Sequence, residues 1–340
     1  MSTDPAAVIA VDAGNSKTDL ALVARDGRLL ASVRGAGMPG DTALADKMEL
    51  LADLVSQAQR QAGLSGSPVA EHICACVANV DLPEEEEEFV AAVEKHAWSN
   101  SLAVVNDTFA VLRAGYAPGG ATPPGAGEPY WGVAVTCGAG INCVGVAPDG
   151  RTTRFLAIGY ISGDWGGGSG IGRAAQWWAI RDEDGRGPRT ALREAVAAHF
   201  GLPTVYDVAV ALHQHRISED SLLDLAPVVM SLAAEGDQVA ARIVQRQAEE
   251  VVAMALAAMR RLGIADLATP VILGGGLLTA RDPLLEAGIT AGLAAGAPDA
   301  VAHVVGVPPI AGAALLGLDH LGVGLAAQQQ LCAAYAPPSG

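Results

Sequence analysis

Residues 8–23 read VIAVDAGNSKTDLALV, in which two apolar runs flank a short segment of small and polar residues. The apolar runs predict strands over 8–12 and 18–23 joined by a tight turn, and a second turn at Asp26-Gly27 leads to a third strand over 28–33. An aspartate, a glycine and a lysine interrupt what would otherwise be a buried hairpin. Glycine and polar residues at this point indicate a backbone that approaches a ligand closely.

The same pattern returns in the second half of the chain. GVAVTCGAGINCVGVAPDGR (132–151) repeats the order strand, small-residue turn, strand and Asp-Gly turn. With an offset of 124 residues, three positions correspond: Thr136 to Asp12, Gly138 to Gly14 and Asn142 to Thr18. Backbone N–H groups in such turns have no strand partner, and groups of this kind bind phosphate oxygens. Two such turns predict a site that holds one polyphosphate from both sides.

Length and charge limit the classes of function. The chain has 340 residues, enough for two domains, and a formal net charge of −16. Nucleic acids and anionic membranes select basic surfaces, so neither is expected as a partner. The first residues lack the features of a signal peptide, and the five cysteines form no C-x-x-C pair, which predicts reduced thiols and no structural metal. A cytoplasmic protein that acts on a small molecule is therefore expected.

The remaining periodicity predicts an α/β protein. A helical pattern covers 41–62, an apolar strand covers 72–78, a helix begins at DLPEEEEEF, and another strand covers 102–106. Residues 117–129 are rich in proline and glycine, so they predict a flexible loop or a domain junction.

Five separated stretches carry a family resemblance that extends over nearly the whole chain. They are DAGNSKTDL (12–20), VVNDTFAVL (104–112), TCGAGINCVG (136–145), LGGGLL (273–278) and PPIAGAALLGL (308–318). In this order they resemble a first phosphate motif, a segment with a catalytic aspartate, a second phosphate motif, an adenosine motif and a connecting helix. The chain thereby resembles the sugar kinases of the actin, Hsp70 and hexokinase superfamily, and within it the branch of the N-acetylglucosamine kinases and the BadF/BadG/BcrA/BcrD ATPases.

The resemblance implies a two-domain actin-like ATPase fold, a duplicated ribonuclease H-like α/β fold with an ATP cleft between the domains. The N-terminal domain would cover 1–114 and be joined by a C-terminal helix over 310–335, and the C-terminal domain would cover 115–309. The implied cofactors are ATP and Mg²⁺, with Asp12 holding the metal through water. The implied ATP-binding residues are Gly14, Asn15, Ser16, Lys17, Thr18, Thr136, Gly138, Gly140, Gly274, Gly275 and Gly276. For Lys17, an ordinary surface position is an equally good interpretation of the sequence.

Asp107 is the expected general base. It follows an apolar strand, where open α/β sheets present residues to a ligand, and the resemblance places it beside the sugar hydroxyl. The alternative is that Asn106-Asp107 only caps a helix beginning at Thr108. The expected substrate-binding residues are Asn106, Asp107, Asn142, Gly163, Asp164 and Asp81.

The segment GYISGDWGGGSGIGR (159–173) resembles the sugar-binding segment of the family, but it departs from the usual GDEGS by reading GDWGG. The acetamide-binding asparagine of N-acetylglucosamine kinases also has no clear counterpart in RGAGMPGD (34–41). The chain looks more like actinobacterial relatives that phosphorylate free glucosamine, which share GDWGGG and DGRGP (184–188). Because a free amino sugar is largely cationic, a pocket with Asp107, Asp164 and Asp81 or Glu183 would favour it. The leading hypothesis is ATP-dependent phosphorylation of the 6-hydroxyl of D-glucosamine.

Three alternatives remain beside it. The first is an N-acetylglucosamine kinase, and the second is an ATPase that activates a partner enzyme and holds an iron–sulfur cluster with cysteines. The third is a dinucleotide enzyme, since GAGMPG (35–40) matches G-x-G-x-x-G, but the proline and the missing ribose-binding acid disfavour it. Kinases of this type are often dimers, so a homodimer is an expectation by analogy only.

Overall fold

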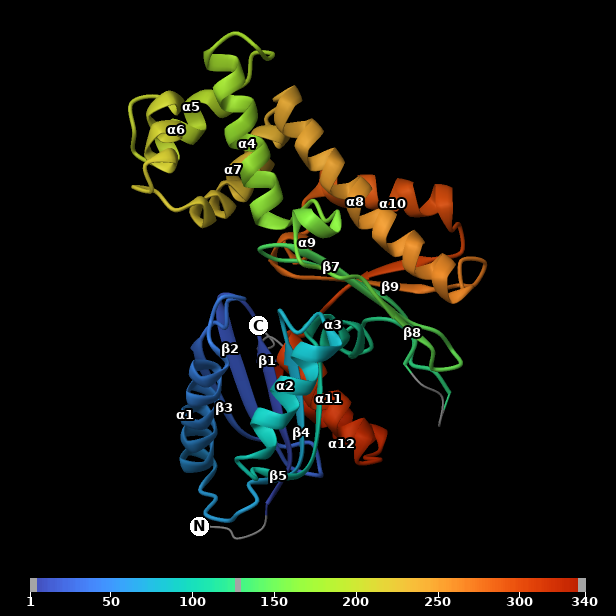
Figure 1. The fold of residues 1–340 in the computed structure, drawn as a ribbon. Helices are drawn as coiled ribbons and strands as arrows, with labels where there is room; N and C mark the ends of the chain where they lie inside the picture. The colour runs from blue at the N-terminus through green and yellow to red at the C-terminus, as the bar shows by residue number, and fades with distance from the viewer. Residues whose placement is uncertain (1–4, 126–129, 336–340) are drawn as a thin grey trace. The chain divides into compact units, whose positions relative to one another are not determined.

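The computed structural model of the protein describes residues 5–125 and 130–335. Part of the predicted junction, residues 126–129, lies outside the described residues. The chain forms two compact units, each drawn in Figure 1. The first contains Met1–Ala134, Val144–Ile158 and His303–Gly340, and the second contains Val135–Cys143 and Gly159–Ala302.

Each half of the chain contributes one five-stranded sheet. The first has the order β3-β2-β1-β4-β5, with β1 antiparallel to β2 and parallel to β4. Its strands are β1 (Ala6–Ala13), β2 (Lys17–Val23), β3 (Leu29–Ala36), β4 (Ala70–Val77) and β5 (Ser99–Asn106). The second has the order β10-β9-β6-β7-β8. Its strands are β6 (Gly132–Cys137), β7 (Ile141–Val146), β8 (Thr152–Arg154), β9 (Pro270–Gly274) and β10 (Val301–Val304).

The helices connect and cover these strands. In the first half they are α1 (Leu44–Ala62), α2 (Pro83–Glu94) and α3 (Asp107–Ala114). In the second half they are η1 (Tyr160–Ser162), α4 (Gly167–Glu183), α5 (Leu192–His199), α6 (Val205–His213), η2 (Glu219–Leu225), α7 (Ala226–Ala234), α8 (Gln238–Leu262), α9 (Gly276–Thr279) and α10 (Pro283–Gly296). Two helices end the described chain: α11 (Pro309–His320) and α12 (Leu325–Tyr335).

The predicted duplication is confirmed by the strand order. In both sheets the third, second and first strands of the half lie in succession, and the fourth and fifth follow beside the first. The Asp-Gly turns repeat in atomic detail. Arg28 N–H donates to Asp26 Oδ1 at 3.1 Å, and Arg151 N–H donates to Asp149 Oδ1 at the same distance. The predicted two-domain α/β fold of the actin-like type agrees with this arrangement.

Alternation along β1 assigns a different set of helices to each face of the first sheet. Ile9 and Val11 belong to a core with residues of α1 and α2, whereas Val8 and Ala10 belong to a core with residues of α3 and α11. The helices α1 and α11 accordingly lie on opposite sides of this sheet in Figure 1. Since side chains alternate with a period of two, Asp12 shares the face of Val8 and Ala10. This register directs Asp12 towards the face covered by α3.

Within the first unit, residues 309–335 form two helices, not the single helix predicted over 310–335. The break follows α11, where Gly322 has a φ of +65°. Small residues let α11 approach its neighbours closely. A Cβ added at Gly312 would lie 1.9 Å from the Ala110 carbonyl oxygen of α3, and one at Gly317 would lie 2.5 Å from Val8 Cγ1.

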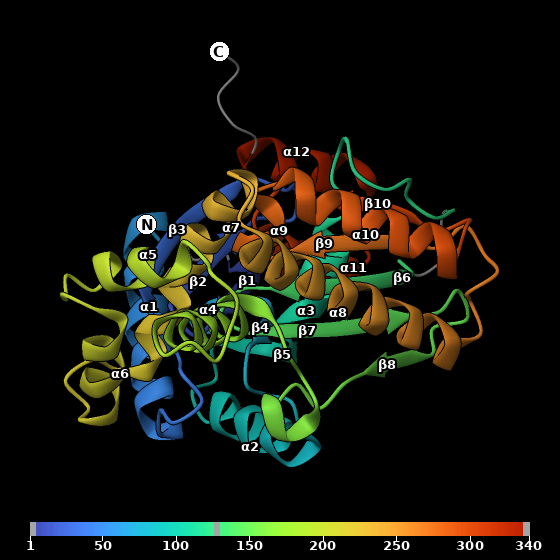
Figure 2. The same cartoon turned by 90° about the horizontal axis from the view of Figure 1, so that it is seen from above.

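In the second unit, α8 and α10 run side by side (Figures 1 and 2). Three glycines spaced by four residues on α10 face α8. An added Cβ would lie 2.7 Å from Ala248 Cβ at Gly288, 2.7 Å from Val252 Cγ2 at Gly292 and 2.4 Å from Leu256 Cδ1 at Gly296. These glycines therefore set the distance between the two helices.

We expect Gly312→Ala to destabilise the protein by about 1–3 kcal/mol, because the new methyl group meets the backbone of α3, which cannot move aside cheaply. Thermal unfolding of the purified variant measures the effect. Gly306→Ala is the matched control, since an added Cβ there meets nothing within 4 Å. Equal melting temperatures for the two variants would contradict the proposed packing constraint.

Candidate functional site

The turn between β1 and β2 is closed and supported by backbone atoms. Gly14 N–H donates to Lys17 O at 2.9 Å, and Met38 N–H donates to Gly14 O at 2.9 Å. Gly37 allows this contact, because an added Cβ would lie 2.1 Å from the Asn15 carbonyl oxygen. The GAGMPG segment, considered above as a dinucleotide motif, thus packs against the first predicted phosphate turn.

The turn between β6 and β7 is supported in the same way. Gly138 N–H donates to Gly140 O at 3.0 Å, and Gly168 N–H, at the start of α4, donates to Gly138 O at 2.8 Å. A Cβ added at Gly167 would lie 2.3 Å from the Gly140 carbonyl oxygen. In each half, therefore, a glycine and the N–H group that follows it hold the turn from behind. This second element of the repeat is not visible in the sequence alignment of the two hairpins.

The outer side of the second turn is open. A Cβ added at Gly138 or Gly140 would meet nothing within 4 Å, so the chain itself does not require glycine at either position. Thr18 Oγ1 and Thr136 Oγ1 are buried and have no hydrogen-bond partner among the described residues. Open glycine turns with orphaned hydroxyl groups suit a ligand rich in acceptor oxygens.

The adenosine motif has a different structural reason for one of its glycines. Gly275 has a φ of +84°, and an added Cβ would lie 2.3 Å from the Cys137 carbonyl oxygen. The backbone of the chain itself therefore requires glycine at position 275. Gly274 ends β9, and a Cβ at Gly276 would meet nothing within 4 Å.

Asp12 lies near the end of β1, with only 8% of its surface exposed. Burial and the nearby Asp107 charge raise the pKa of Asp12 to about 7, and the Lys17 charge opposes this shift. A hard cation would remove the repulsion between the two carboxylates, and carboxylate oxygen is a ligand that Mg²⁺ prefers. The residues present therefore fit a magnesium ion held by Asp12.

Asp107 is the first residue of α3, one position earlier than the predicted helix start. Asn106 is the N-cap: its Oδ1 accepts from Thr108 N–H at 3.0 Å, and its Nδ2 donates to Asp81 Oδ1 at 2.8 Å. The alternative that Asn106-Asp107 only caps the helix therefore holds for Asn106, which is the cap. Burial raises the pKa of Asp107 to about 6, although hydrogen bonds from Thr108 oppose the shift. Asp107 is thereby a carboxylate whose basicity is close to that needed at neutral pH.

A row of charged residues crosses three strands beside Asp12. Asp12 pairs in register with Asp19 of β2, and Asp19 pairs with Arg34 of β3. Arg34 contacts Asp19 through two hydrogen bonds of 2.6 and 3.0 Å, and Lys17 Nζ donates to Asp19 Oδ2 at 2.8 Å. Burial opposes ionisation of Asp19, but the hydrogen bonds from Arg34 and Lys17 outweigh it and lower its pKa. Lys17 is therefore paired with Asp19, so it is not an unpaired surface lysine, and a phosphate would share it with this carboxylate.

The predicted sugar segment lies in the second unit. Gly163 has a φ of +87°, and Asp164 accepts a hydrogen bond from the Ser162 hydroxyl. The next residue, Trp165, lies under the Arg246 guanidinium, whose carbon is 4.0 Å from the ring centroid. Asn142, on β7, accepts a hydrogen bond from the adjacent Cys143 N–H at 2.7 Å.

The structure groups the predicted residues by unit. In the first unit Asp12, Asp107, Asn106 and Asp81 lie near the carboxyl ends of the strands, beside the turn that contains Gly14, Asn15, Ser16, Lys17 and Thr18. In the second unit the turn with Thr136, Gly138 and Gly140 contacts the start of α4 and the Gly275 backbone.

Two residues that support the site, Asn79 and Gln247, were not predicted from the sequence. Asn79 has a φ of +57°, and its Nδ2 donates to Asn15 Oδ1 at 2.7 Å, which holds the first turn from the end of β4. An asparagine two residues after a strand is the feature that could have indicated this, because asparagine tolerates the left-handed conformation. Gln247 could have been recognised more easily than Asn79, because it is a polar residue within the apolar stripe of α8.

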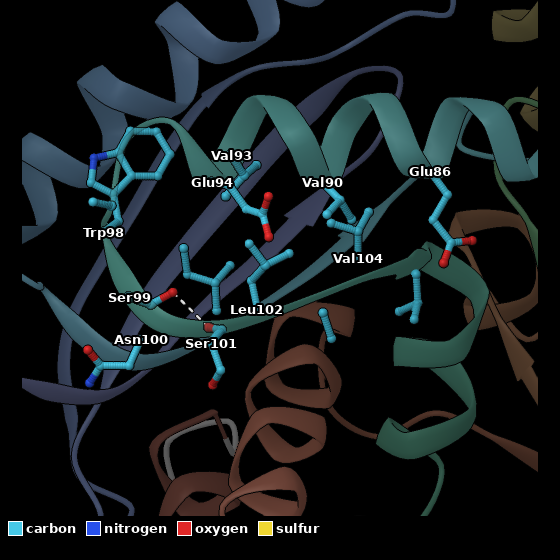
Figure 3. A pocket seen from close by; sticks show the side chains of 14 residues that line it. Glu86, Val90, Val93, Glu94, Trp98, Ser99, Asn100, Ser101, Leu102 and Val104 are labelled. Atoms are coloured by element: carbon cyan, nitrogen blue, oxygen red, sulfur yellow. Dashed lines mark hydrogen bonds between the residues drawn. The ribbon is translucent and has the colours of Figure 1, made fainter.

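A groove at the edge of the first sheet is separate from these residues (Figure 3). It has a volume of about 590 Å³ and lies between α2 and β5. Its lining combines apolar side chains with two glutamates, including Val90, Val93, Leu102, Val104, Glu86 and Glu94. None of the predicted site residues lines it, so we do not assign the predicted chemistry to this groove.

The cysteines of the second hairpin do not favour an iron–sulfur site. The thiols of Cys137 and Cys143 are fully buried, and burial raises the pKa of both. A cluster ligand must be a thiolate, which this environment disfavours.

Comparisons with known proteins identify the family and agree with the fold. Residues 9–317 match the BadF/BadG/BcrA/BcrD ATPase family, and the chain belongs to this family. The predicted membership is thus confirmed, as are the actin-like fold and the use of ATP with Mg²⁺ that characterises the family.

Individual relatives extend the comparison. An N-acetylmuramic acid/N-acetylglucosamine kinase of Clostridium acetobutylicum is 25% identical over 272 residues, which is 80% of this chain and 85% of the relative. A solved structure described as a candidate N-acetylglucosamine kinase from Chromobacterium violaceum has a TM-score of 0.70 and 26% identity, covering 92% of this chain and 99% of the other. A ROK family glucokinase from Streptomyces griseus, solved with glucose and AMPPNP, has a TM-score of 0.57 at 18% identity, covering 92% and 98%, and shows the fold alone.

In residues 5–125 and 130–335, no helix combines the length and apolar character needed to cross a membrane.

We expect Asp12→Asn to stabilise the protein in the absence of nucleotide and metal. The folded state raises the pKa of Asp12 from 3.8 to about 7, so its contribution to stability is highest below pH 4 and decreases as the pH rises towards 7. Asparagine does not ionise, so the variant avoids this loss of stability. We expect its free energy of unfolding to exceed that of the wild type by on the order of 2 kcal/mol at pH 8, and to equal it at pH 4. Urea unfolding at both pH values measures it.

Asp41→Asn, at an exposed position, is the control for the loss of a negative charge. An Asp12→Asn protein less stable than the wild type at pH 8 would contradict the electrostatic strain assigned to Asp12.

Proposed function

We propose that this protein, a sugar kinase, transfers the terminal phosphoryl group of ATP to the 6-hydroxyl of D-glucosamine, giving glucosamine 6-phosphate and ADP. The observation that carries the proposal is the buried carboxylate pair, Asp12 and Asp107, beside a glycine turn. One carboxylate suits a metal, and the other has a pKa suited to a base. Sugar kinases are phosphotransferases with an alcohol group as acceptor, and both groups serve that reaction.

In this proposal Asp107 orients the sugar hydroxyl and accepts its proton as the bond to phosphorus forms. Phosphoryl transfer needs little covalent participation by the protein, so orientation and charge stabilisation supply most of the rate enhancement. The hydrogen bonds of Asn106 to Thr108 and to Asp81 support this role, because they fix the start of α3 and hence the Asp107 backbone. Asp81 would act in part through Asn106.

The two glycine turns would bind the phosphates of ATP. Their support from behind, by Met38 N–H in one half and Gly168 N–H in the other, leaves the ligand side of each turn free to present N–H groups. The buried hydroxyl groups of Thr18 and Thr136 would donate to phosphate oxygens. Asp12 would hold Mg²⁺, and the bound ion would supply positive charge that offsets the charge of the phosphates.

The preference for an amino sugar rests on charge. Asp107, Asp81 and Asp164 are the carboxylates expected near the substrate, and a cationic amino group gains from them while an acetamide does not. Trp165 takes the place of the glutamate of the usual GDEGS pattern, and its ring is held against Arg246. Gly163 and Asp164 would bind sugar hydroxyl groups.

N-acetylglucosamine is a second candidate substrate. The Clostridium relative acts on N-acetylmuramic acid and N-acetylglucosamine according to its name, and the Chromobacterium structure is described as a candidate N-acetylglucosamine kinase. Against it stands the early loop 34–41, where Gly37 and Met38 are occupied in supporting the first turn. An ATPase that activates a partner enzyme is less well supported, since the buried thiols of Cys137 and Cys143 do not suit a cluster.

The deciding experiment is a coupled ADP-release assay with D-glucosamine, N-acetylglucosamine and glucose. We expect kcat/KM for glucosamine to exceed that for the other two sugars at least about tenfold, because the loss of one charge-assisted contact costs about 1.5–3 kcal/mol. A higher kcat/KM for N-acetylglucosamine would reassign the substrate. Absence of turnover with all three sugars would contradict the assignment of the protein as a sugar kinase.

We expect Asp107→Asn to lower kcat at least about a hundredfold while leaving nucleotide affinity within twofold, since only the base is removed. In the wild type, kcat/KM should fall as the pH decreases through about 6, where Asp107 becomes protonated. Glu94→Gln, in the groove of Figure 3, is the control for loss of an acidic residue outside the proposed site. Near-normal turnover of Asp107→Asn would remove this residue from the mechanism.

A further inference from the structure

Helix α8 contains a buried polar residue that the proposed chemistry does not use. Gln247 is 0% exposed and lies between apolar residues of the same helix face, including Val244 and Val251. Burial of an amide is unfavourable unless both its donor and its acceptor groups are satisfied. The partners of Gln247 therefore indicate why a glutamine occupies this position.

Both ends of the Gln247 amide contact segments proposed for ligand binding. Gly167 N–H, at the end of the sugar segment, donates to Gln247 Oε1 at 2.8 Å. Gln247 Nε2 lies 3.5 Å from Cys137 Sγ, directly before the second phosphate turn. Gly166 has a φ of +141°, and an added Cβ would lie 2.9 Å from the Gln247 amide, so the segment approaches the glutamine as closely as glycine permits.

The contact continues beyond the glutamine on both sides. Gly168 N–H donates to Gly138 O, and Ser169 N–H donates to Ala139 O at 2.9 Å, so the residues after Gly167 hold the phosphate turn directly. On the other side, Arg246 stacks on Trp165, which follows Asp164 in the chain. Two consecutive residues of α8 thereby fix the segment from Trp165 to Gly167, between the residues proposed for sugar and for phosphate.

From this geometry we infer that Gln247 is a positioning residue that couples the sugar segment to the second phosphate turn, so that sugar and nucleotide bind cooperatively. A sugar that fixes Asp164 also fixes Gly167 and Gly168, and these residues set the position of the Gly138–Gly140 turn. The first ligand to bind orders the shared segment, so the second ligand binds without that loss of entropy. This inference rests on the proposed function, because it assigns the two ligands to those segments.

The test compares Gln247→Met with Gln245→Leu. Methionine has a similar length and no hydrogen-bonding amide, so it removes the contacts with little change in volume. Gln245 lies on the exposed side of the same helix and contacts Glu249, so its substitution controls for changes in α8. Isothermal titration measures the Kd of AMPPNP with and without saturating sugar for each protein. The sugar is the one with the highest kcat/KM in the ADP-release assay.

We expect the sugar to tighten AMPPNP binding at least about fivefold in the wild type and in Gln245→Leu, and less than twofold in Gln247→Met. Gln247→Glu should restore part of the coupling, because a protonated carboxyl group retains an acceptor for Gly167 N–H and a donor for Cys137. If Gln247 had a purely structural role, Gln247→Glu would instead reduce the coupling more than Gln247→Met, because it buries an acid. Should Gln247→Met fail to fold, the sugar-induced change in AMPPNP affinity is compared between Gln247→Glu and Gln245→Leu. The expected result is then a smaller change in Gln247→Glu.

Equal coupling in the wild type and Gln247→Met would overturn the inference, and so would a wild type in which sugar leaves AMPPNP affinity unchanged. A wild type that turns over no sugar would instead contradict the proposed function. The two failures are thus distinguishable within one set of measurements.

Discussion

A contact between two segments of backbone underlies the proposed site, and it occurs once in each half of the chain. A glycine without a side chain lets one segment lie against the back of a hairpin turn, and the N–H group that follows it donates to the turn's first glycine carbonyl. Gly37 and Met38 make this contact with Asn15 and Gly14, and Gly167 and Gly168 make it with Gly140 and Gly138. A turn fixed from behind can present its outer N–H groups to a ligand without reorganisation, which is the condition for strong electrostatic stabilisation.

The carboxylates near the first turn are arranged for chemistry at the expense of stability. Burial raises the pKa of both Asp12 and Asp107, and the Asp107 charge raises that of Asp12 further. Neither carboxylate is neutralised by a basic residue in the way that Asp19 is by Arg34 and Lys17. The contrast between Asp12 and Asp19, which are direct partners across β1 and β2, is informative. One is neutralised within the chain, whereas the other retains its demand for a cation, as expected for a residue that binds a metal.

In the second unit, neutral groups support the corresponding turn. Its turn holds Thr136 where the first has Asp12, and its support comes from α4 and from the amide of Gln247. A buried amide satisfied at both ends fixes geometry without adding charge, and a single residue can thus join two functional segments. Duplication of the strand order has been kept, while the chemistry of the two halves has diverged.

The sequence by itself determined the hairpins, their duplication, the family and the identity of the acidic candidates. These features are local or repeated: strand periodicity, glycine turns and motif order are read along the chain without knowledge of distant contacts. Asp107 was singled out by its place after a strand, although the helix begins at that residue and Asn106, not Asp107, provides the cap.

Only the tertiary structure decided which segments support the site. The contact of Asn79 with Asn15, the packing of Gly275 against Cys137 and the position of Gln247 join residues that are distant in sequence. The same holds for the break between α11 and α12 at Gly322. Such contacts depend on the register of strands and on the face that a helix presents, and neither is fixed by local propensity because packing of the whole core selects them.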